Sequence, residues 1–153
     1  MTTQLTDHFS LDELIASDTA VRQGIANQPS VEVAENLLLL AENLEKVRAI
    51  LGRPMNISSG FRCQELNARI GGAQNSAHVQ GLAADFTCPQ FGTPVDTCRE
   101  LLNHADALDW DQLIQEGTWV HIAFAKHGDT ARRDVLTANF SGGRTTYTRG
   151  VTG

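Results

Sequence analysis

The sequence predicts an α+β fold in which N-terminal helices pack on a small antiparallel sheet. Residues 30–51 carry apolar side chains at the spacing of one long amphipathic helix. After residue 55 the apolar runs are short and are separated by turn residues, as strands are. Residues 110–124 hold two such runs on either side of Gly117-Thr118, which indicates a hairpin. The chain has 153 residues, enough for one core, so we expect a single domain over 1–153.

Capping residues and an apolar stripe mark the first helices. Ser10 is followed three residues later by Glu13, the spacing of a capped helix start. The long helix is expected to end at Gly52 and Pro54, which suit a helix terminus and the residues after it. Its apolar positions are Val33, Leu37, Leu40, Leu44, Val47 and Leu51. Their spacing of three and four residues predicts one buried face.

The remaining elements are shorter, and their order places strands late in the chain. Gly and polar clusters divide this part into short segments. A polar loop is expected at 73–81, and the tail from residue 144 is expected to be an edge strand or a frayed end. The other expected elements are a strand at 55–59, a helix at 63–70, a strand at 82–87, a helix at 96–105 and the hairpin of 110–116 with 119–124.

Composition argues against several classes of protein. The formal net charge is −6, whereas a protein that binds nucleic acid normally has a basic face. The longest apolar run, residues 37–41, is far shorter than the roughly 20 residues that span a bilayer. The N-terminus lacks a basic start and an apolar run, so we expect cytoplasmic synthesis without a signal peptide. With an odd cysteine count and no CxxC pair, Cys63, Cys88 and Cys98 are expected to be reduced.

The segment of residues 76–85, SAHVQGLAAD, carries the most chemical information. His78 lies in the polar loop, Asp85 lies in the next strand, and Gly81 between them lets the backbone turn. Imidazole nitrogen and carboxylate oxygen are both zinc ligands, and a catalytic zinc site uses three protein ligands. Alternate strand residues share a face, so small Ala83 would leave room beside Asp85. The other histidines that could supply a third ligand are His8, His104, His121 and His127.

This segment resembles the SxHxxGxAxD motif of the zinc D-Ala-D-Ala peptidases. That family includes murein carboxypeptidases, vancomycin-resistance dipeptidases and phage L-alanyl-D-glutamate endolysins. The matching positions are Ser76, His78, Gly81, Ala83 and Asp85. The resemblance covers about residues 56–124 and implies that His78 and Asp85 bind zinc. It points to His121 as the third ligand, because the family's last zinc histidine lies late in a strand next to a tryptophan.

An acidic residue near the last histidine serves as the catalytic base in this family. In the dipeptidase branch it lies three positions earlier, but Thr118 occupies that position here. The run DQxxxE…WVH instead resembles the phage branch, which makes Glu116 and Asp111 the candidates. With a two-residue turn, Ile114 pairs with His121, and Glu116 lies on the same face while Asp111 points away. We therefore favour Glu116, although a register slip of one residue would reverse the choice.

Three further residues are candidates for substrate binding. The run SGFR at 59–62 resembles the family's SG[FY]R segment, which implies that Arg62 binds substrate or stabilises developing charge. A guanidinium suits either role, because its fork of donors can hold a carboxylate or an oxyanion. Ser76 is expected to contact the substrate or to order the loop. Trp119, beside the candidate base, is expected to contact the substrate.

Together these resemblances imply one Zn²⁺ per chain, carried by the sheet, and a zinc metallopeptidase that cleaves peptidoglycan stem peptides by attack of zinc-bound water. Both D-Ala-D-Ala carboxypeptidase and L-Ala-D-Glu endopeptidase activities fit these residues. The alternative is a catalytically silent zinc-containing module that binds the cell wall or has a structural role in a phage. Taken singly, each residue has an ordinary structural explanation, such as a solvated histidine in a loop. We expect a monomer that reaches the cell wall, for example after phage holin release.

Overall fold

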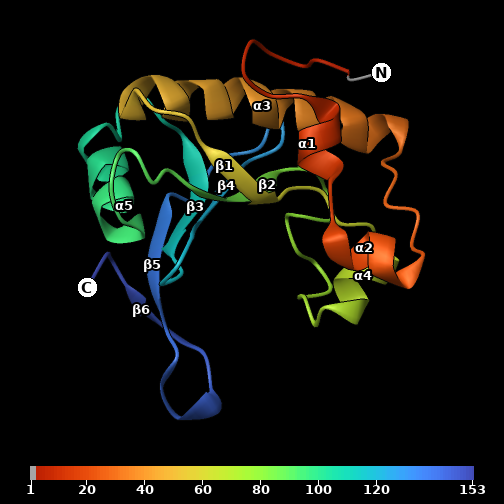
Figure 1. The fold of residues 1–153 in the computed structure, drawn as a ribbon. Coiled ribbons are helices and arrows are strands. Elements are labelled where there is room, and N and C mark those ends of the chain that lie inside the picture. The colour runs from red at the N-terminus through yellow and green to blue at the C-terminus, as the bar shows by residue number, and fades with distance from the viewer. Residues whose placement is uncertain (1–2) are drawn as a thin grey trace.

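The computed structural model describes residues 3–153, and a six-stranded sheet lies at its centre (Figure 1). Its strands are β1 (Asn56–Ser59), β2 (Ala83–Thr87), β3 (Trp110–Gln115), β4 (Val120–Phe124), β5 (Asp134–Asn139) and β6 (Thr146–Arg149). Their order in the sheet is β1-β2-β4-β3-β5-β6. The α+β class is confirmed. The sheet is mostly antiparallel, but β3 and β5 run parallel, which the sequence did not predict.

Side-chain caps and glycines set the ends of the helices. The helices are α1 (Leu11–Ile15), α2 (Asp18–Gln23), α3 (Val31–Leu51), α4 (Gln64–Arg69), α5 (Pro94–Asn103) and the short 3-10 turn η1 (Ser141–Gly143). Ser10 Oγ accepts a hydrogen bond from Glu13 N at 3.1 Å, as predicted. The helix expected at 96–105 begins earlier, because Thr93 and Asp96 form a capping box around its first turn.

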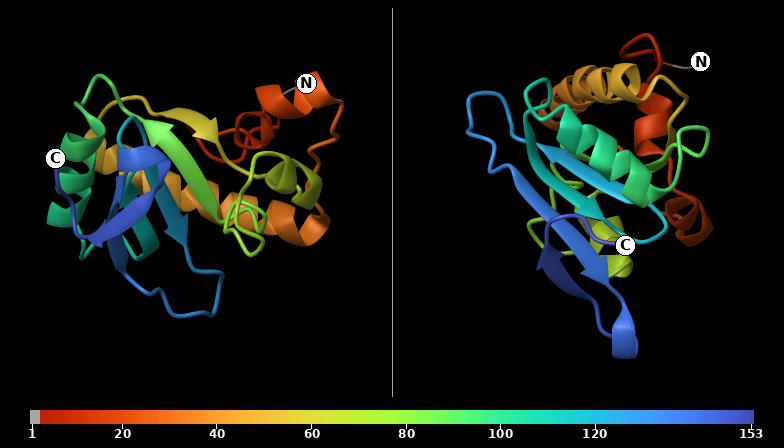
Figure 2. Two further views of the ribbon diagram at one scale, coloured as in Figure 1. Left: turned by 90° about the horizontal axis from the view of Figure 1, so that it is seen from below. Right: turned by 90° about the vertical axis from the view of Figure 1, so that its left-hand side faces the viewer.

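Helices α3 and α5 cover one face of the sheet and bury the core against it (Figures 1 and 2). Five of the six predicted stripe positions on α3 are buried, and Val33 is partly buried. They pack with sheet residues such as Phe86, Leu113 and Ile122. Among the described residues, no helix has the length and apolarity that crossing a membrane requires.

The chain adds β5 to the far side of β3, and the path of the backbone explains why the pair is parallel. Strand β4 is antiparallel to β3, so β4 ends beside the start of β3. The loop of residues 125–133 then crosses this end of the sheet, and β5 begins at the same end as β3. Strand β6 returns antiparallel to β5 and forms the edge of the sheet. The β5–β6 hairpin projects away from the helices (Figure 1).

The register of the hairpin β3–β4 agrees with the sequence prediction. Ile114 pairs with His121, and Gln115 pairs with Val120. The N–H of Glu116 donates to the carbonyl of Trp119 at 3.0 Å, and Gly117 has a φ of 84° in the turn. The turn therefore has a backbone that favours glycine, and it fixes which residues share a face with His121.

Candidate metal centre

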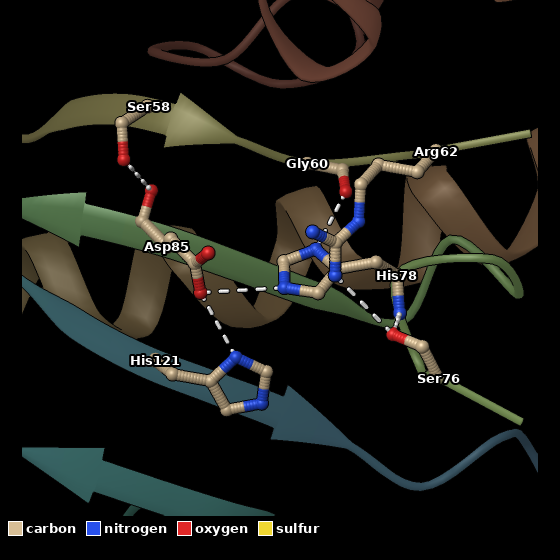
Figure 3. A network of polar contacts seen from close by, with 7 residues as sticks. All are labelled: Ser58, Gly60, Arg62, Ser76, His78, Asp85 and His121. Atoms are coloured by element: carbon tan, nitrogen blue, oxygen red, sulfur yellow. Dashed lines mark hydrogen bonds and ion pairs between the residues drawn. The ribbon is translucent and has the colours of Figure 1, made fainter. Parts of the chain in front are cut away.

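Three candidate ligands from separate segments meet on the sheet face that α3 and α5 leave open (Figure 3). His78 comes from the loop before β2, Asp85 from β2 and His121 from β4, where it pairs directly with Asp85. One ligand atom of each lies within 4.8 Å of the other two. Asp85 Oδ1 lies 2.9 Å from His121 Nδ1 and 3.3 Å from His78 Nε2. The residues that the sequence predicted as metal ligands are thus brought together.

A close approach to helix α3 positions the loop that carries His78. Gly81 has a φ of 75°, and a Cβ at this position would lie 2.9 Å from Val33 Cγ1 and 3.1 Å from Leu37 Cγ. Only glycine meets both conditions, so the loop can fold onto α3 and turn into β2. The backbone of Arg62 donates to the carbonyl of His78 at 3.1 Å on the other side of the loop.

The hydrogen bond that His78 makes with the backbone sets which of its ring nitrogens faces Asp85. His78 Nδ1 lies 2.7 Å from the carbonyl of Gly60, which can only accept, so Nδ1 carries the proton. In the neutral ring, Nε2 then directs a lone pair at the carboxylate of Asp85. Two acceptors at this distance repel each other unless a proton or a metal ion lies between them.

The donor set of the cluster, two imidazole nitrogens and one carboxylate oxygen, fits a zinc ion. Three protein ligands leave one coordination position for water or substrate, as catalytic zinc sites require. Burial alone would raise the pKa of Asp85, but hydrogen bonds from the protonated rings of His121 and His78, and the positive charges of those rings, outweigh it. The pKa of Asp85 therefore lies well below its usual value, and the carboxylate is ready to bind a cation.

Arg62 and Ser76 lie beside His78 (Figure 3). Ser76 Oγ accepts from Arg62 Nη2 at 3.4 Å and from the backbone N–H of His78 at 3.2 Å, so it orders the loop. Within the described chain, the buried Nε of Arg62 has no hydrogen-bond partner. Burial lowers the pKa of Arg62, and the nearby charge of Asp85 opposes this shift. Arg62 thus keeps one donor for a further acceptor.

The two acids that the sequence left open have different surroundings. Asp111 accepts from Arg132 Nη2 at 2.9 Å and Nε at 3.1 Å, and its pKa is lowered because these bonds outweigh burial. Burial raises the pKa of Glu116, the charge of His121 lowers it by less, and the negative charge of Asp85 adds a still smaller increase. Glu116 is thus within electrostatic range of the cluster, whereas Asp111 is held in an ion pair with Arg132.

The side chain of Trp119 is half-buried at the β3–β4 turn, directly before strand β4, which carries His121. Its N-terminal neighbours Gly117 and Thr118 are exposed, and its carbonyl accepts from Glu116. The structure therefore places Trp119 on the turn that also holds Glu116, at the end of the hairpin.

Two hollows adjoin at the cluster. One has a volume of about 600 Å³ and includes His121 in its lining, with Ser76, Gln80, Asp111, Lys126 and Arg132. The other has a volume of about 390 Å³ and includes Asp85 in its lining, with Ser17, Asp18, Arg22, Ser59 and Arg62. Because Asp85 contacts His121, the cluster forms the boundary between the two hollows.

One positioning residue had no signal in the sequence. Asn27 is 7% exposed, and its amide nitrogen donates to the carbonyls of Ile15 and Phe61 at 2.8 and 3.0 Å. Its amide oxygen accepts from the N–H of Cys63 at 2.8 Å. Asn27 thereby holds the backbone of Phe61 and Cys63, the residues on either side of Arg62. These three bonds link residues far apart in sequence, so local pattern could not reveal them.

Comparison with known proteins agrees with this geometry. A family model described as Peptidase M15 matches residues 7–123, which include all three candidate ligands. A zinc D-Ala-D-Ala carboxypeptidase of Streptomyces albus G is 38% identical over 52 residues. This match covers 33% of the chain and 20% of the relative, so the chain spans about a fifth of that protein's length. Because the family model spans most of the chain, the protein belongs to the peptidase M15 family.

Proposed function

We propose that the protein is a zinc-dependent peptidase that cleaves peptidoglycan stem peptides. The observation that carries this proposal is the cluster of His78, Asp85 and His121 at the boundary of two hollows. A bound zinc ion would lower the pKa of water toward about 7 and would polarise a carbonyl. A site of this kind suits hydrolysis of an amide bond, and the relative from Streptomyces albus G is a zinc D-Ala-D-Ala carboxypeptidase.

Glu116 is the general base in this proposal. It would accept a proton from the attacking water and would later donate it to the leaving amine. A raised pKa suits both steps, because the optimal pKa of a group that first accepts and then donates lies near the working pH. Asp111 is less suited, since its Oδ1 already accepts from the backbone N–H of Arg132 and its Oδ2 accepts from the Arg132 guanidinium.

Arg62 has the role of binding charge on the substrate. Arg62 lines the smaller hollow, and its guanidinium can donate there to a substrate carboxylate or to the oxyanion that develops at the scissile carbonyl. Ser76 holds both Arg62 and the loop of His78, so it positions these groups and can contact the substrate from the lining of the larger hollow. Trp119 would contact the substrate beside Glu116.

The hollows on both sides of the cluster favour a substrate that extends in both directions from the bond that is cleaved. This arrangement supports an endopeptidase of the L-Ala-D-Glu type. D-Ala-D-Ala carboxypeptidase activity is the second candidate, and the carboxypeptidase from Streptomyces albus G favours it. The two activities differ in whether residues follow the cleaved bond, so the products distinguish them.

We also propose one zinc ion in each single-domain monomer and a phage-like origin, with release through a holin as the route to the cell wall. The phage assignment is supported by Asp111-Gln112, Glu116 and the WVH run at 119–121. A silent wall-binding or structural module would retain the ligands without turnover. Arg62 lies beside His78, and the charges of His121 and Asp85 reach Glu116, and this supports an active enzyme.

The test is incubation of the purified protein with muropeptides, with and without a chelator, followed by mass spectrometry and a zinc assay. We expect cleavage that the chelator stops and that added zinc restores, with the mass lost identifying the bond. Bound zinc with no product from any stem peptide would support the silent module instead. A protein that binds no zinc would contradict the proposal at its base.

A further inference from the structure

The β5–β6 hairpin extends the sheet face that carries the candidate metal centre. Residues that pair across strands share a face. His121 pairs with Ile114, Ile114 pairs with Leu136, and Leu136 pairs with Arg149. This row crosses four strands and places Arg149 on the same face as His121. The family model ends at residue 123, so the hairpin lies outside the segment that it matches.

A second row places Tyr147 on the same face, in line with Glu116. Strands β3 and β5 are in register at Gln115 and Thr137, so the next residues along, Glu116 and Ala138, are neighbours. Ala138 pairs with Tyr147 on β6. Because Ala138 has only a methyl side chain, no bulky group on this row separates Tyr147 from Glu116.

Two observations independent of register also connect the hairpin to the β3–β4 turn. The ring of Phe140 packs on Gly117, where an added Cβ would lie 3.1 Å from Phe140 Cε2. The pKa of Tyr147 is raised by burial and then by the negative charge of Glu116. Tyr147 nevertheless remains 51% exposed, so a ligand can reach it. The β5–β6 hairpin therefore lies against the β3–β4 turn, which carries the proposed base Glu116.

The reach of the two side chains suits a substrate group a few residues from the cleaved bond. Three strand spacings separate β4 from β6, which is about 14 Å at roughly 4.8 Å each. An extended peptide advances about 3.3 Å per residue, so this span corresponds to about four residues. The long side chains of Tyr147 and Arg149 shorten the distance that the substrate must cover.

We propose that Tyr147 and Arg149 form a substrate subsite that binds a carboxylate of the stem peptide on the β6 side of the metal centre. This subsite rests on the proposed function. It lies toward the β6 edge of the sheet, whereas the hollow that Arg62 lines lies toward the β1 edge. Arg149 is exposed, and none of the ion pairs within residues 3–153 involves it. A guanidinium beside a phenol can hold a carboxylate through charge-assisted hydrogen bonds.

The test measures peptide affinity by calorimetry in the Glu116→Gln background, so that no turnover is needed. The probes are a stem peptide and versions of it in which each carboxylate is amidated in turn. We expect Arg149→Gln to weaken binding about three- to tenfold, the size of an exposed charge-assisted contact. Amidation of the carboxylate that Arg149 binds should weaken peptide binding to the Glu116→Gln parent by the same factor. It should cause no further loss of binding in the Arg149→Gln variant.

Two further variants complete the experiment. Tyr147→Phe should weaken binding less than Arg149→Gln, and Thr146→Ala, which changes the opposite face of β6, should leave it unchanged. With Glu116 intact, Arg149→Gln should raise KM and leave kcat unchanged. Equal affinities in the Arg149→Gln and Thr146→Ala variants, or no peptide binding at all, would overturn the subsite. Arg149-dependent binding without cleavage by the wild-type protein would support the subsite and contradict the proposed peptidase.

Discussion

The strands that carry two of the candidate metal ligands and the β5–β6 hairpin belong to one sheet, but their neighbours constrain them to different degrees. Strands β2 and β4 lie inside the sheet, and their core-facing residues pack against α3 and α5. All four residues of β6 are exposed, and β6 has one neighbouring strand. A buried centre holds ligands in fixed geometry, whereas an exposed edge can change with little effect on the fold. The candidate metal centre thus lies in the constrained region, and the proposed subsite lies in the exposed one.

Removal of a ligand from the constrained region should have the largest effect. Asp85→Asn keeps the shape of the side chain but removes the charge that draws a cation to the two histidines. We expect zinc affinity to fall by more than about 100-fold, beyond the loss typical of residues that only support ligands, and cleavage to fall to background. Zinc content after dialysis measures the first effect. Asp134→Asn, the same change on β5, should retain zinc, and an equal loss there would contradict the assignment.

Glu116→Gln should reduce cleavage while zinc remains bound. Loss of a general base costs about 10²- to 10⁴-fold in rate. Glu116 is absent from the group of ligand atoms, so zinc content should match that of the wild type. Steady-state kinetics and a zinc assay on the same sample provide the measurement. Glu42→Gln, on the exposed side of α3, serves as the matched control. Unchanged turnover would remove Glu116 from the mechanism.

The pH dependence of cleavage should show the raised pKa of Glu116. As a base, Glu116 must be ionised, so kcat/KM should fall about tenfold per pH unit below that pKa. The Glu116→Gln variant should lack this acidic limb in its residual activity. An acidic limb of the same midpoint in the variant would assign the titration to another group.

The carboxyl groups of Asp85 and Glu116 should change the pH dependence of folding stability in opposite directions. The lowered pKa of Asp85 stabilises the folded state above the usual pKa of about 4, and this contribution is lost as the pH falls. The raised pKa of Glu116 means that ionisation of Glu116 costs stability as the pH rises through that value. At neutral pH the metal-free Glu116→Gln variant should therefore unfold at higher denaturant than the metal-free parent.

A pair of glycine variants separates backbone strain from the close approach of α3. Gly81→Ala places a side chain on a backbone with a φ of 75° and also brings its Cβ too close to Val33. The substitution should cost about 2–4 kcal/mol of unfolding free energy. Gly71→Ala has a similar φ of 76° with nothing within 4 Å, so it should cost only the strain, about 1 kcal/mol. Denaturant unfolding measures both. Equal losses would show that contact with α3 does not position the His78 loop.

The smallest effect on stability is expected at the exposed edge. Thr146→Ala on β6 should change the unfolding free energy by less than about 0.5 kcal/mol, as surface substitutions usually do. Leu113→Ala, in the buried strand β3, should cost about 2–5 kcal/mol because it leaves a cavity. Thermal or denaturant unfolding of the two variants tests the contrast. Similar losses would mean that the hairpin is as constrained as the centre.

Local signals predicted the parts of the fold that local interactions determine. Ser10, the α3 stripe and the turn after Glu116 each act within a few residues, and the structure confirms them. The parallel pairing of β3 with β5 depends on a loop that crosses the end of the sheet, so no short motif revealed it. The candidate ligands were predicted because the motif resembles that of a known family. The carbonyl of Gly60, which orients His78, is a backbone group that every residue type carries.

The central claim is that His78, Asp85 and His121 together bind zinc. Anomalous diffraction at the zinc edge, from crystals grown with zinc, tests this claim most directly. We expect one strong peak per chain, with the zinc ion about 2.0–2.2 Å from a nitrogen of each histidine and from an oxygen of Asp85. No peak at the cluster, or a peak bound elsewhere, would contradict the account.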